Sequence, residues 1–283
     1  MTQLVELQQR KAELEAAGVQ VYAVTYDPQE ALAKFAEKHG ISYQLLSDEG
    51  SEVIRRFGIL NTLIDPDDPA RHPATGQSFY GIPYPGTYIT DEDGVVTEKS
   101  FFTRYEQRVS AGTILDRALG RVLLHEEAPQ EELRERMATI TAFLADEALR
   151  RDVASTLYVR VAMDEGFHIY AEPLPEGFVP TTVAVGPVEG LEVGEAAYPA
   201  THPREFPELG VTLPVYDGTA VIAVPVTATP ALFAATPGEP KVAAIPVKVT
   251  YQACSETVCH RPRTVEIVLE APLAGLVMPD FRR

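Results

Sequence analysis

The chain contains two cysteines, Cys254 and Cys259, and they lie five positions apart. The thiolate form of cysteine is a nucleophile, and two cysteines this close can form and break a disulfide bond. The segment around them predicts a strand, a turn and a second strand, which would bring the two side chains together. A reversible thiol–disulfide function is therefore our first hypothesis.

Three other interpretations of the cysteine pair stay open at this stage. The disulfide could be permanent, although its short loop would constrain the unfolded chain only modestly. The two thiols could instead be reduced and inert. With His260 they could bind a metal ion, but that set is one ligand short of a structural zinc site. The neighbouring Arg261 and Arg263 could favour the thiolate form.

The strand before Cys254 has two distinct faces, because alternate residues of a strand point to opposite sides. One face is apolar and consists of Ile245, Val247, Val249 and Tyr251. The other face is polar and consists of Lys248, Thr250, Gln252 and Cys254. A core thiol would belong on the apolar face, so we expect Cys254 to lie on the polar face of a hairpin.

A hairpin closed over residues 255–258 would place Cys254 directly opposite Cys259. Opposed Cβ atoms in a non-hydrogen-bonded pair lie about 4.5 Å apart, which is close to the separation that a disulfide needs. The same register would pair apolar residues such as Val249 with polar residues of the second strand. A β-bulge near Pro262 would resolve this conflict.

The composition limits the classes of function that the chain can have. Its 283 residues are long enough for two domains, and 45% hydrophobic with 23% charged residues is ordinary for a soluble globular protein. A formal net charge of −17 disfavours nucleic acid, whose phosphates would be repelled. No apolar run approaches the roughly 18–20 residues that span a bilayer, so we expect no membrane span. The first ten residues lack the apolar stretch of a secretory signal, and the compartment stays undetermined.

The first part of the chain alternates between helix and strand patterns. Apolar spacing and glycine stops predict helices over residues 2–17, 27–40, 52–57 and 110–120. β-rich runs predict strands over residues 19–26, 43–46, 87–90 and 95–97. The first of these strands is nearly all apolar, as a buried parallel strand should be. Residues 69–86 are rich in proline, glycine and serine and predict a loop.

The second part of the chain has a different character. The acidic stretch 123–136 predicts a linker between a domain at residues 1–122 and another at 137–283. Beyond the linker, short β-rich runs cover residues 155–161, 168–170, 181–185, 219–226, 241–250 and 264–269. Many short strands separated by prolines and glycines indicate a β-sandwich.

Two segments of the first domain, Val21–Asp27 and Gly81–Gly94, resemble the AhpC/TSA (redoxin, peroxiredoxin-like) family. This resemblance implies an α/β thioredoxin-like fold. It also implies a cis peptide bond before a proline that precedes a Thr-aromatic strand. Pro85 is the better candidate for that proline, with Pro83 as its rival.

The first domain departs from this family in one important respect. The family places its reactive cysteine at the start of the first long helix, after an interior strand. This chain begins inside that helix and has no cysteine in residues 1–253. We therefore expect an incomplete thioredoxin-like domain without its first strand and active-site motif. A degenerate scaffold, a fragment, or a start assigned downstream of the true one would each explain this. A selenocysteine codon read as a stop is one specific cause of the last.

Two segments of the second domain, His168–Pro175 and Tyr251–Pro262, resemble the N-terminal domain of the thiol:disulfide interchange protein DsbD. The resemblance implies an all-β immunoglobulin-like sandwich whose cysteine pair accepts and passes on electrons by disulfide exchange. That role falls on Cys254 and Cys259, although the usual spacing in the family is one residue longer. We interpret His168 as a structural strand residue rather than a ligand.

Together these patterns predict a thiol–disulfide oxidoreductase or peroxiredoxin-like antioxidant protein, with Cys254 and Cys259 as catalytic residues and no cofactor or metal ion. The expected partner is a thioredoxin-like protein or a membrane thiol reductase, and the expected substrate is a peroxide or a disulfide. The alternative is a non-catalytic module that binds a redox partner and contains a structural disulfide.

Overall fold

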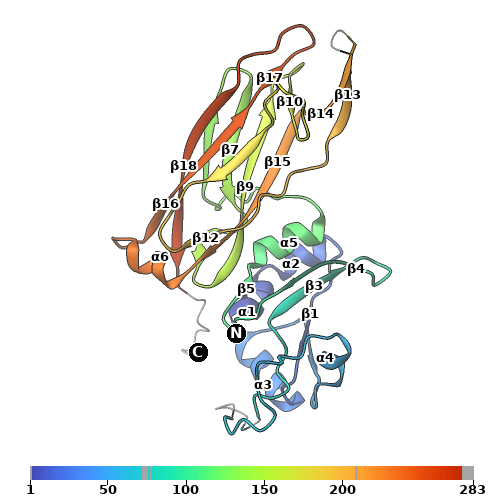
Figure 1. Cartoon of the computed structure of the whole chain (residues 1–283). Helices are drawn as coiled ribbons and strands as arrows, with labels where there is room; N and C mark the ends of the chain where they lie inside the picture. The colour runs from blue at the N-terminus through green and yellow to red at the C-terminus, as the bar shows by residue number, and fades with distance from the viewer. Residues whose placement is uncertain (1, 72–75, 77, 208–209, 276–283) are drawn as a thin grey trace. The chain divides into compact units, whose positions relative to one another are not determined.

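The computed structural model describes residues 2–71, 76, 78–207 and 210–275. These residues form two compact units, the first ending at Arg121 and the second spanning Val122–Gly275 (Figure 1). No helix in the described part of the chain is long and apolar enough to cross a lipid bilayer.

The first unit consists of short helices and strands. In chain order they are α1 (Thr2–Gln9), α2 (Lys11–Ala16), β1 (Tyr22–Thr25), α3 (Gln29–His39), β2 (Gln44–Ser47), α4 (Glu52–Arg56), β3 (Gly86–Thr90), β4 (Val96–Phe101), β5 (Arg108–Val109) and α5 (Ala111–Leu119). Strands β1 and β2 pair in parallel, and β3 and β4 pair antiparallel. The predicted alternation of helix and strand is therefore confirmed.

Local sequence signals explain where these helices begin and end. Gly40 ends α3 in the left-handed conformation, with φ of 62°, which a glycine adopts at little cost. Ser110 caps α5, because its side-chain oxygen accepts a hydrogen bond of 3.1 Å from the backbone N–H of Thr113. The single helix predicted over residues 2–17 is instead two helices that meet at Arg10.

Strand β1 is more exposed than its sequence predicts. Tyr22 is 54% exposed and Val24 is 43% exposed, whereas an apolar parallel strand was expected to be buried. Among the described residues, β1 pairs with β2 alone, and a two-stranded sheet leaves much of its surface uncovered. The prediction of a buried strand is therefore wrong for these two residues.

The second unit is built almost entirely of strands. They are β6 (Gln130–Arg134), β7 (Ala138–Leu144), β8 (Leu149–Arg150), β9 (Val153–Met163), β10 (His168–Tyr170), β11 (Thr182–Val185), β12 (Leu191–Val193), β13 (His202–Phe206), β14 (Val211–Asp217), β15 (Thr219–Ala228), β16 (Val242–Tyr251), β17 (Ala253–Cys254) and β18 (Arg263–Ala274), with one helix, α6 (Pro230–Ala235). These elements include every strand predicted beyond residue 137, so the predicted β-rich character is confirmed.

The strands form layers around one core. One sheet has the order β12-β15-β9-β7-β6, a second has β11-β16-β18-β8, and a third, at the end of the sandwich opposite α6, has β13-β14-β10-β17 (Figure 1). The core between the first two sheets contains Leu157, Val159, Val161, Ile222, Val224, Ile245, Val247 and Val249. Alternate residues of β16 are buried and the residues between them more exposed, as its sequence pattern predicts.

The acidic segment at the start of this unit is a strand rather than a linker. Residues 130–134 form β6, which pairs antiparallel with β7 through positions such as Glu132 and Thr141. The linker predicted over residues 123–136 is therefore wrong for this stretch. Strand β6 is the last strand of its sheet in the order above, and charged side chains are common on such strands because they prevent pairing with other chains.

Candidate functional site

Cys254 and Cys259 form a disulfide bond at the tip of the β16–β18 hairpin, with Cα atoms 4.1 Å apart. The two residues make an isolated antiparallel bridge, and the backbone N–H of Ser255 donates a 2.9 Å hydrogen bond to the carbonyl of Val258. The predicted hairpin over residues 255–258 is thus present. Since the sulfurs are bonded to each other, two reduced thiols do not describe this structure.

The predicted irregularity near Pro262 is also present. Strands β16 and β18 pair Val249 with Val265 and Tyr251 with Arg263. Residues 252–253 then face residues 260–262 before the cysteine bridge, so the second strand carries one extra residue there. This extra residue lets apolar positions pair with apolar positions in the sandwich while the cysteines still meet at the tip.

The two cysteines have opposite environments. Cys254 is fully buried, at 0% exposure, whereas Cys259 is exposed. Cys254 belongs to a buried cluster with Tyr170, Leu213 and Val215. The prediction that Cys254 lies on the polar face of the hairpin is therefore wrong. Strand β17 pairs with β10, and side chains from the third sheet cover this side of the hairpin.

Aromatic side chains surround the disulfide. Tyr170 is fully buried, and its hydroxyl lies 3.4 Å from Sγ of Cys259. A disulfide sulfur has no proton, so the tyrosine hydroxyl donates in this contact. Burial raises the pKa of Tyr170 above its ordinary value, which keeps the hydroxyl protonated at neutral pH. The ring of Tyr170 meets the ring of Phe178 edge-on at 5.2 Å between centroids.

A polar network lies on the same strands. His168 is fully buried, and its Nδ1 lies 2.7 Å from Nη1 of Arg204. Asp217 accepts a 3.1 Å hydrogen bond from Nη2 of Arg204 and also pairs with Nε2 of His202. Burial lowers the pKa of His168 below its ordinary value, and the charge of Arg204 lowers it further. His168 is opposite Cys254 in the pairing of β10 with β17.

Gln252 fixes the hairpin to the rest of the unit. Its side-chain carbonyl accepts a 3.1 Å hydrogen bond from the backbone N–H of Val179, and its amide donates one of 3.1 Å to the carbonyl of His260. Gln252 is 9% exposed. Both ends of a nearly buried amide are therefore satisfied, which holds the segment just before Cys254 in place.

The positively charged residues near Cys259 have different surroundings. Arg263 forms an ion pair of 3.0 Å with Glu135, so its charge is partly balanced. Arg136, His260 and Arg261 line an open depression of about 500 Å³ beside the hairpin. Among the described residues, no group of three or more His, Cys, Asp or Glu side chains gathers in a way that could hold a metal ion.

The predicted cis-proline is not found at Pro85. Within the described residues, the cis bonds precede Pro173 and Pro240, and neither Pro85 nor its rival Pro83 follows one. The backbone on both sides of the Tyr84–Pro85 bond is hydrogen-bonded, with the N–H of Tyr84 donating to Ile59 and the carbonyl of Pro85 accepting from Phe102. The prediction at Pro85 is therefore wrong, and the Tyr84–Pro85 bond has the trans form that X–Pro bonds generally favour.

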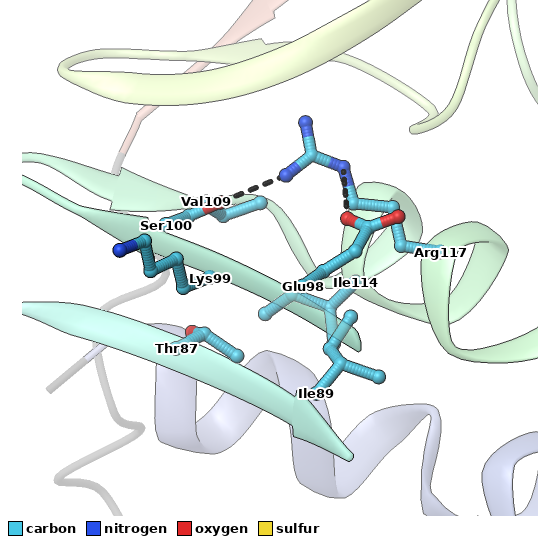
Figure 2. Close-up of a pocket in the computed structure, with 8 residues that line it drawn as sticks. All are labelled: Thr87, Ile89, Glu98, Lys99, Ser100, Val109, Ile114 and Arg117. Carbon is cyan, nitrogen blue, oxygen red and sulfur yellow. Dashed lines mark hydrogen bonds and ion pairs between the residues drawn. The ribbon is translucent and has the colours of Figure 1, made fainter. Parts of the chain in front are cut away.

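Figure 2 shows a small cavity in the first unit, of about 10 Å³. Arg117 extends over it, with Nη1 donating a 2.8 Å hydrogen bond to Oγ of Ser100 and Nε 3.6 Å from Glu98. Such a volume holds about one water molecule, and its lining includes no cysteine or histidine. This cavity is a detail of packing, and the disulfide lies in the second unit.

The two units match two different protein families. Residues 141–271 match the family model of thiol:disulfide interchange protein DsbD, N-terminal. Residues 1–99 match the model of the AhpC/TSA family. The first unit is thus a thioredoxin-like redoxin domain and the second a DsbD-like immunoglobulin-type β-sandwich, as predicted. With the disulfide, these matches support a thiol–disulfide redox function in general.

Individual relatives match parts of the chain. Peroxiredoxin Bcp of Escherichia coli (strain K12) is 33% identical over 88 residues, which are 30% of this chain and 47% of that protein. The chain therefore spans about half the length of the curated relatives it matches. The N-terminal periplasmic domain of ScsB from Proteus mirabilis has 14% identity and a TM-score of 0.37, over 51% of this chain and 53% of that one. The reduced DsbD N-terminal domain of Neisseria meningitidis has 19% identity and a TM-score of 0.29, over 53% and 91%.

Several residues of the DsbD-like site had no chemical role assigned from sequence. Tyr170 and His168 lie within the DsbD-like segment His168–Pro175, and their spacing of two places them on one face of a strand. No sequence pattern indicated a role for Arg204 or Asp217, because their strands, β13 and β14, were not predicted. The pairing of β10 with β17 places His168 opposite Cys254, and the pairing of β10 with β14 places Asp217 opposite His168.

Proposed function

We propose that the DsbD-like unit exchanges the Cys254–Cys259 disulfide with the thiol of a thioredoxin-like partner. The chain thereby passes two electrons toward a site that reduces a peroxide or a disulfide. The observation that supports this most directly is the contrast between an exposed Cys259 and a fully buried Cys254 within one disulfide. A partner can reach one sulfur and not the other.

The exchange proceeds in two displacement steps. A partner thiolate attacks Sγ of Cys259, a mixed disulfide forms, and the electron pair of the broken bond leaves on Sγ of Cys254. A second thiol of the partner then attacks the mixed disulfide and releases the Cys259 thiolate. The chain ends with two reduced cysteines, and the partner ends with a disulfide. Run in reverse, the same steps deliver two electrons to an oxidised partner.

The hydroxyl of Tyr170 supports the step in which Cys259 carries charge. It lies 3.4 Å from Sγ of Cys259 and remains protonated at neutral pH. A hydrogen bond donated to a sulfur stabilises the thiolate more than the neutral disulfide. Tyr170 therefore favours the reduced form of Cys259 and lowers the barrier to its release.

The peroxide-reducing part of the proposal rests on the AhpC/TSA match and the similarity to peroxiredoxin Bcp. Residues 1–253 contain no cysteine, so within this sequence the exchanging thiols are Cys254 and Cys259. A reactive residue that the pair serves would belong to a thioredoxin-like partner site. The competing function is a non-catalytic module with a structural disulfide, which the burial of Cys254 would equally suit.

Trapping of mixed disulfides tests the proposed exchange. Cys254→Ser leaves the exposed Cys259 without the residue that would resolve a mixed disulfide, so this full-length variant should accumulate a covalent adduct with an oxidised thioredoxin-like protein. Cys259→Ser leaves only the buried Cys254 and should accumulate at least tenfold less adduct, on the order expected for a sulfur without access. Non-reducing electrophoresis and mass spectrometry measure both. If neither variant forms an adduct, the exchange proposal fails.

A further inference from the structure

His168 lies opposite Cys254 in the antiparallel pairing of β10 with β17 and is completely buried. Paired residues in such strands project their side chains from the same face of the sheet. The imidazole also meets the ring of Tyr170 edge-on, at 5.4 Å between centroids, and Tyr170 in turn contacts Cys259. The histidine is therefore part of the buried surroundings of the disulfide.

The contact with Arg204 determines where the proton of the imidazole sits. Nη1 of Arg204 lies 2.7 Å from Nδ1 of His168, and a guanidinium can only donate hydrogen bonds. Nδ1 must therefore accept, and the neutral ring carries its proton on Nε2. Burial and the arginine charge both lower the pKa of His168, so the neutral form prevails at neutral pH. Asp217, which also pairs with His202, holds Arg204 in this position.

The proton on Nε2 is left without a partner in the oxidised protein. Nε2 of His168 is buried and makes no hydrogen bond within the part of the chain that the structure describes. Buried donors in folded proteins are nearly always satisfied, so an exception next to a disulfide calls for a functional explanation. A disulfide sulfur is a weak acceptor, whereas a thiolate is a strong one.

We propose that His168 donates the hydrogen bond that stabilises the Cys254 thiolate as the disulfide opens. This inference rests on the proposed exchange. When a partner thiolate attacks Cys259, a new sulfur–sulfur bond joins the partner to Cys259, and the electron pair of the old bond leaves on Sγ of Cys254. That negative charge appears inside an apolar cluster, where an uncompensated charge is costly. The Nε2–H group of His168 compensates this charge. Arg204, which donates to Nδ1 of the same ring, contributes its positive charge.

The pKa of the Cys254 thiol tests this inference directly. In full-length Cys259→Ser protein, Cys254 is the single thiol, and the chemical shift of a carbon-13 label at its Cβ reports its ionisation against pH. Adding His168→Phe keeps a buried ring but removes the donor. The thiol pKa should rise by about one to two units, the size of one hydrogen bond to a charged group. His168→Gln retains a side-chain N–H, so its thiol pKa should rise by no more than about half as much as in His168→Phe.

Two further variants guard against a purely structural effect. Arg204→Gln alters a partly exposed residue, so it tests the same idea if His168→Phe does not fold, and it should also raise the thiol pKa. His202→Gln leaves the contact between Arg204 and His168 in place and should change the thiol pKa by less than about 0.3 units. An unchanged thiol pKa in a folded His168→Phe protein, or in Arg204→Gln, overturns the inference.

The rate of exchange separates this inference from the function on which it rests. With both cysteines present, reduced glutathione is the probe thiol, and loss of the disulfide is followed in time. A higher pKa of the leaving thiol slows its departure, so His168→Phe should slow the reaction by roughly three- to tenfold. If the unmodified protein exchanges and His168→Phe does so equally fast, the role of His168 is wrong. If the unmodified protein does not exchange with any thiol, the proposed function itself is wrong.

Discussion

Cys254 and Cys259 are chemically identical, and their surroundings give them different roles in the proposed exchange. Cys259 is exposed and contacts the hydroxyl of Tyr170, which suits the sulfur that a partner attacks. Cys254 is fully buried among apolar side chains, which suits the sulfur that leaves. In the proposed exchange, the third sheet thus determines which sulfur a partner attacks, because it covers Cys254 and leaves Cys259 open.

Replacing Tyr170 tests the importance of the hydroxyl. Tyr170→Phe keeps the buried ring and its contacts with Phe178 but removes the donor that faces Cys259. Loss of one hydrogen bond is worth about 0.5–1.5 kcal/mol, so exchange with a partner thiol should slow by roughly two- to tenfold. Stopped-flow kinetics of disulfide reduction at neutral pH measures this change.

Tyr251→Phe is the matched control for this experiment. Tyr251 is also fully buried, but its hydroxyl makes no hydrogen bond among the described residues, and it lies on the core face of β16. Its removal should leave the exchange rate within about twofold, because no partner is lost. Equal rates for both variants would show that the Tyr170 hydroxyl does not act on the sulfur.

At the scale of single residues, the sequence predicted the pair but not its surroundings. The spacing of Cys254 and Cys259 and the turn between them were sufficient to predict a disulfide. The burial of Cys254 was not predictable, because its cover comes from distant segments; Tyr170 is 89 positions from Cys259. Pro85 shows the converse, since a family resemblance suggested a cis bond that the structure does not contain.

Among the elements, the β16–β18 hairpin determines where the disulfide lies. Its register is fixed by buried residues in the sandwich, and the extra residue before Arg263 changes that register just before the cysteines. Gln252 then fixes the end of the hairpin through hydrogen bonds to Val179 and His260. The site therefore combines a rigid strand pair with one irregular step.

Gln252→Leu should weaken this anchoring. The backbone N–H of Val179 and the carbonyl of His260 both lose a partner, and loss of partners for partly buried groups costs about 1–3 kcal/mol. Urea unfolding of the oxidised protein measures the loss in the free energy of unfolding. Thr250→Val is the control, because it removes an exposed hydroxyl pair with Thr264 and should cost under about 1 kcal/mol. A loss no larger in Gln252→Leu than in the control would contradict the anchoring role.

The elements themselves were predicted unevenly, for physical reasons. Strands with strong alternation, such as β16, follow directly from their sequence because one face is buried. Strand β6 has an acidic sequence like that of a linker, since its stability comes from pairing with β7 rather than from its own composition. The extra residue near Pro262 was predictable because the register of the cysteines conflicted with the apolar pattern.

In the whole molecule, two compact units share one chain, and both cysteines belong to the second. The two matched families both concern thiol redox chemistry, yet the thiols of this sequence lie outside the redoxin segment. This division means that reduction of the disulfide changes bonds in the DsbD-like unit alone.

Reduction should therefore destabilise only one of the two units. A disulfide that closes a loop of six residues contributes about 2 kcal/mol by constraining the unfolded chain. Scanning calorimetry of the full chain with and without dithiothreitol should show the transition of the DsbD-like unit move to lower temperature while that of the first unit stays in place. Movement of both transitions by the same amount would contradict independent units.

The reduction potential of the Cys254–Cys259 pair tests the central claim most directly. The full chain is equilibrated with dithiothreitol buffers of defined potential, and the reduced fraction is measured by alkylation after denaturation. An exchanging disulfide should have a potential above about −300 mV, within reach of a thioredoxin-like donor. A potential well below about −300 mV would identify a structural bond and contradict the proposed exchange.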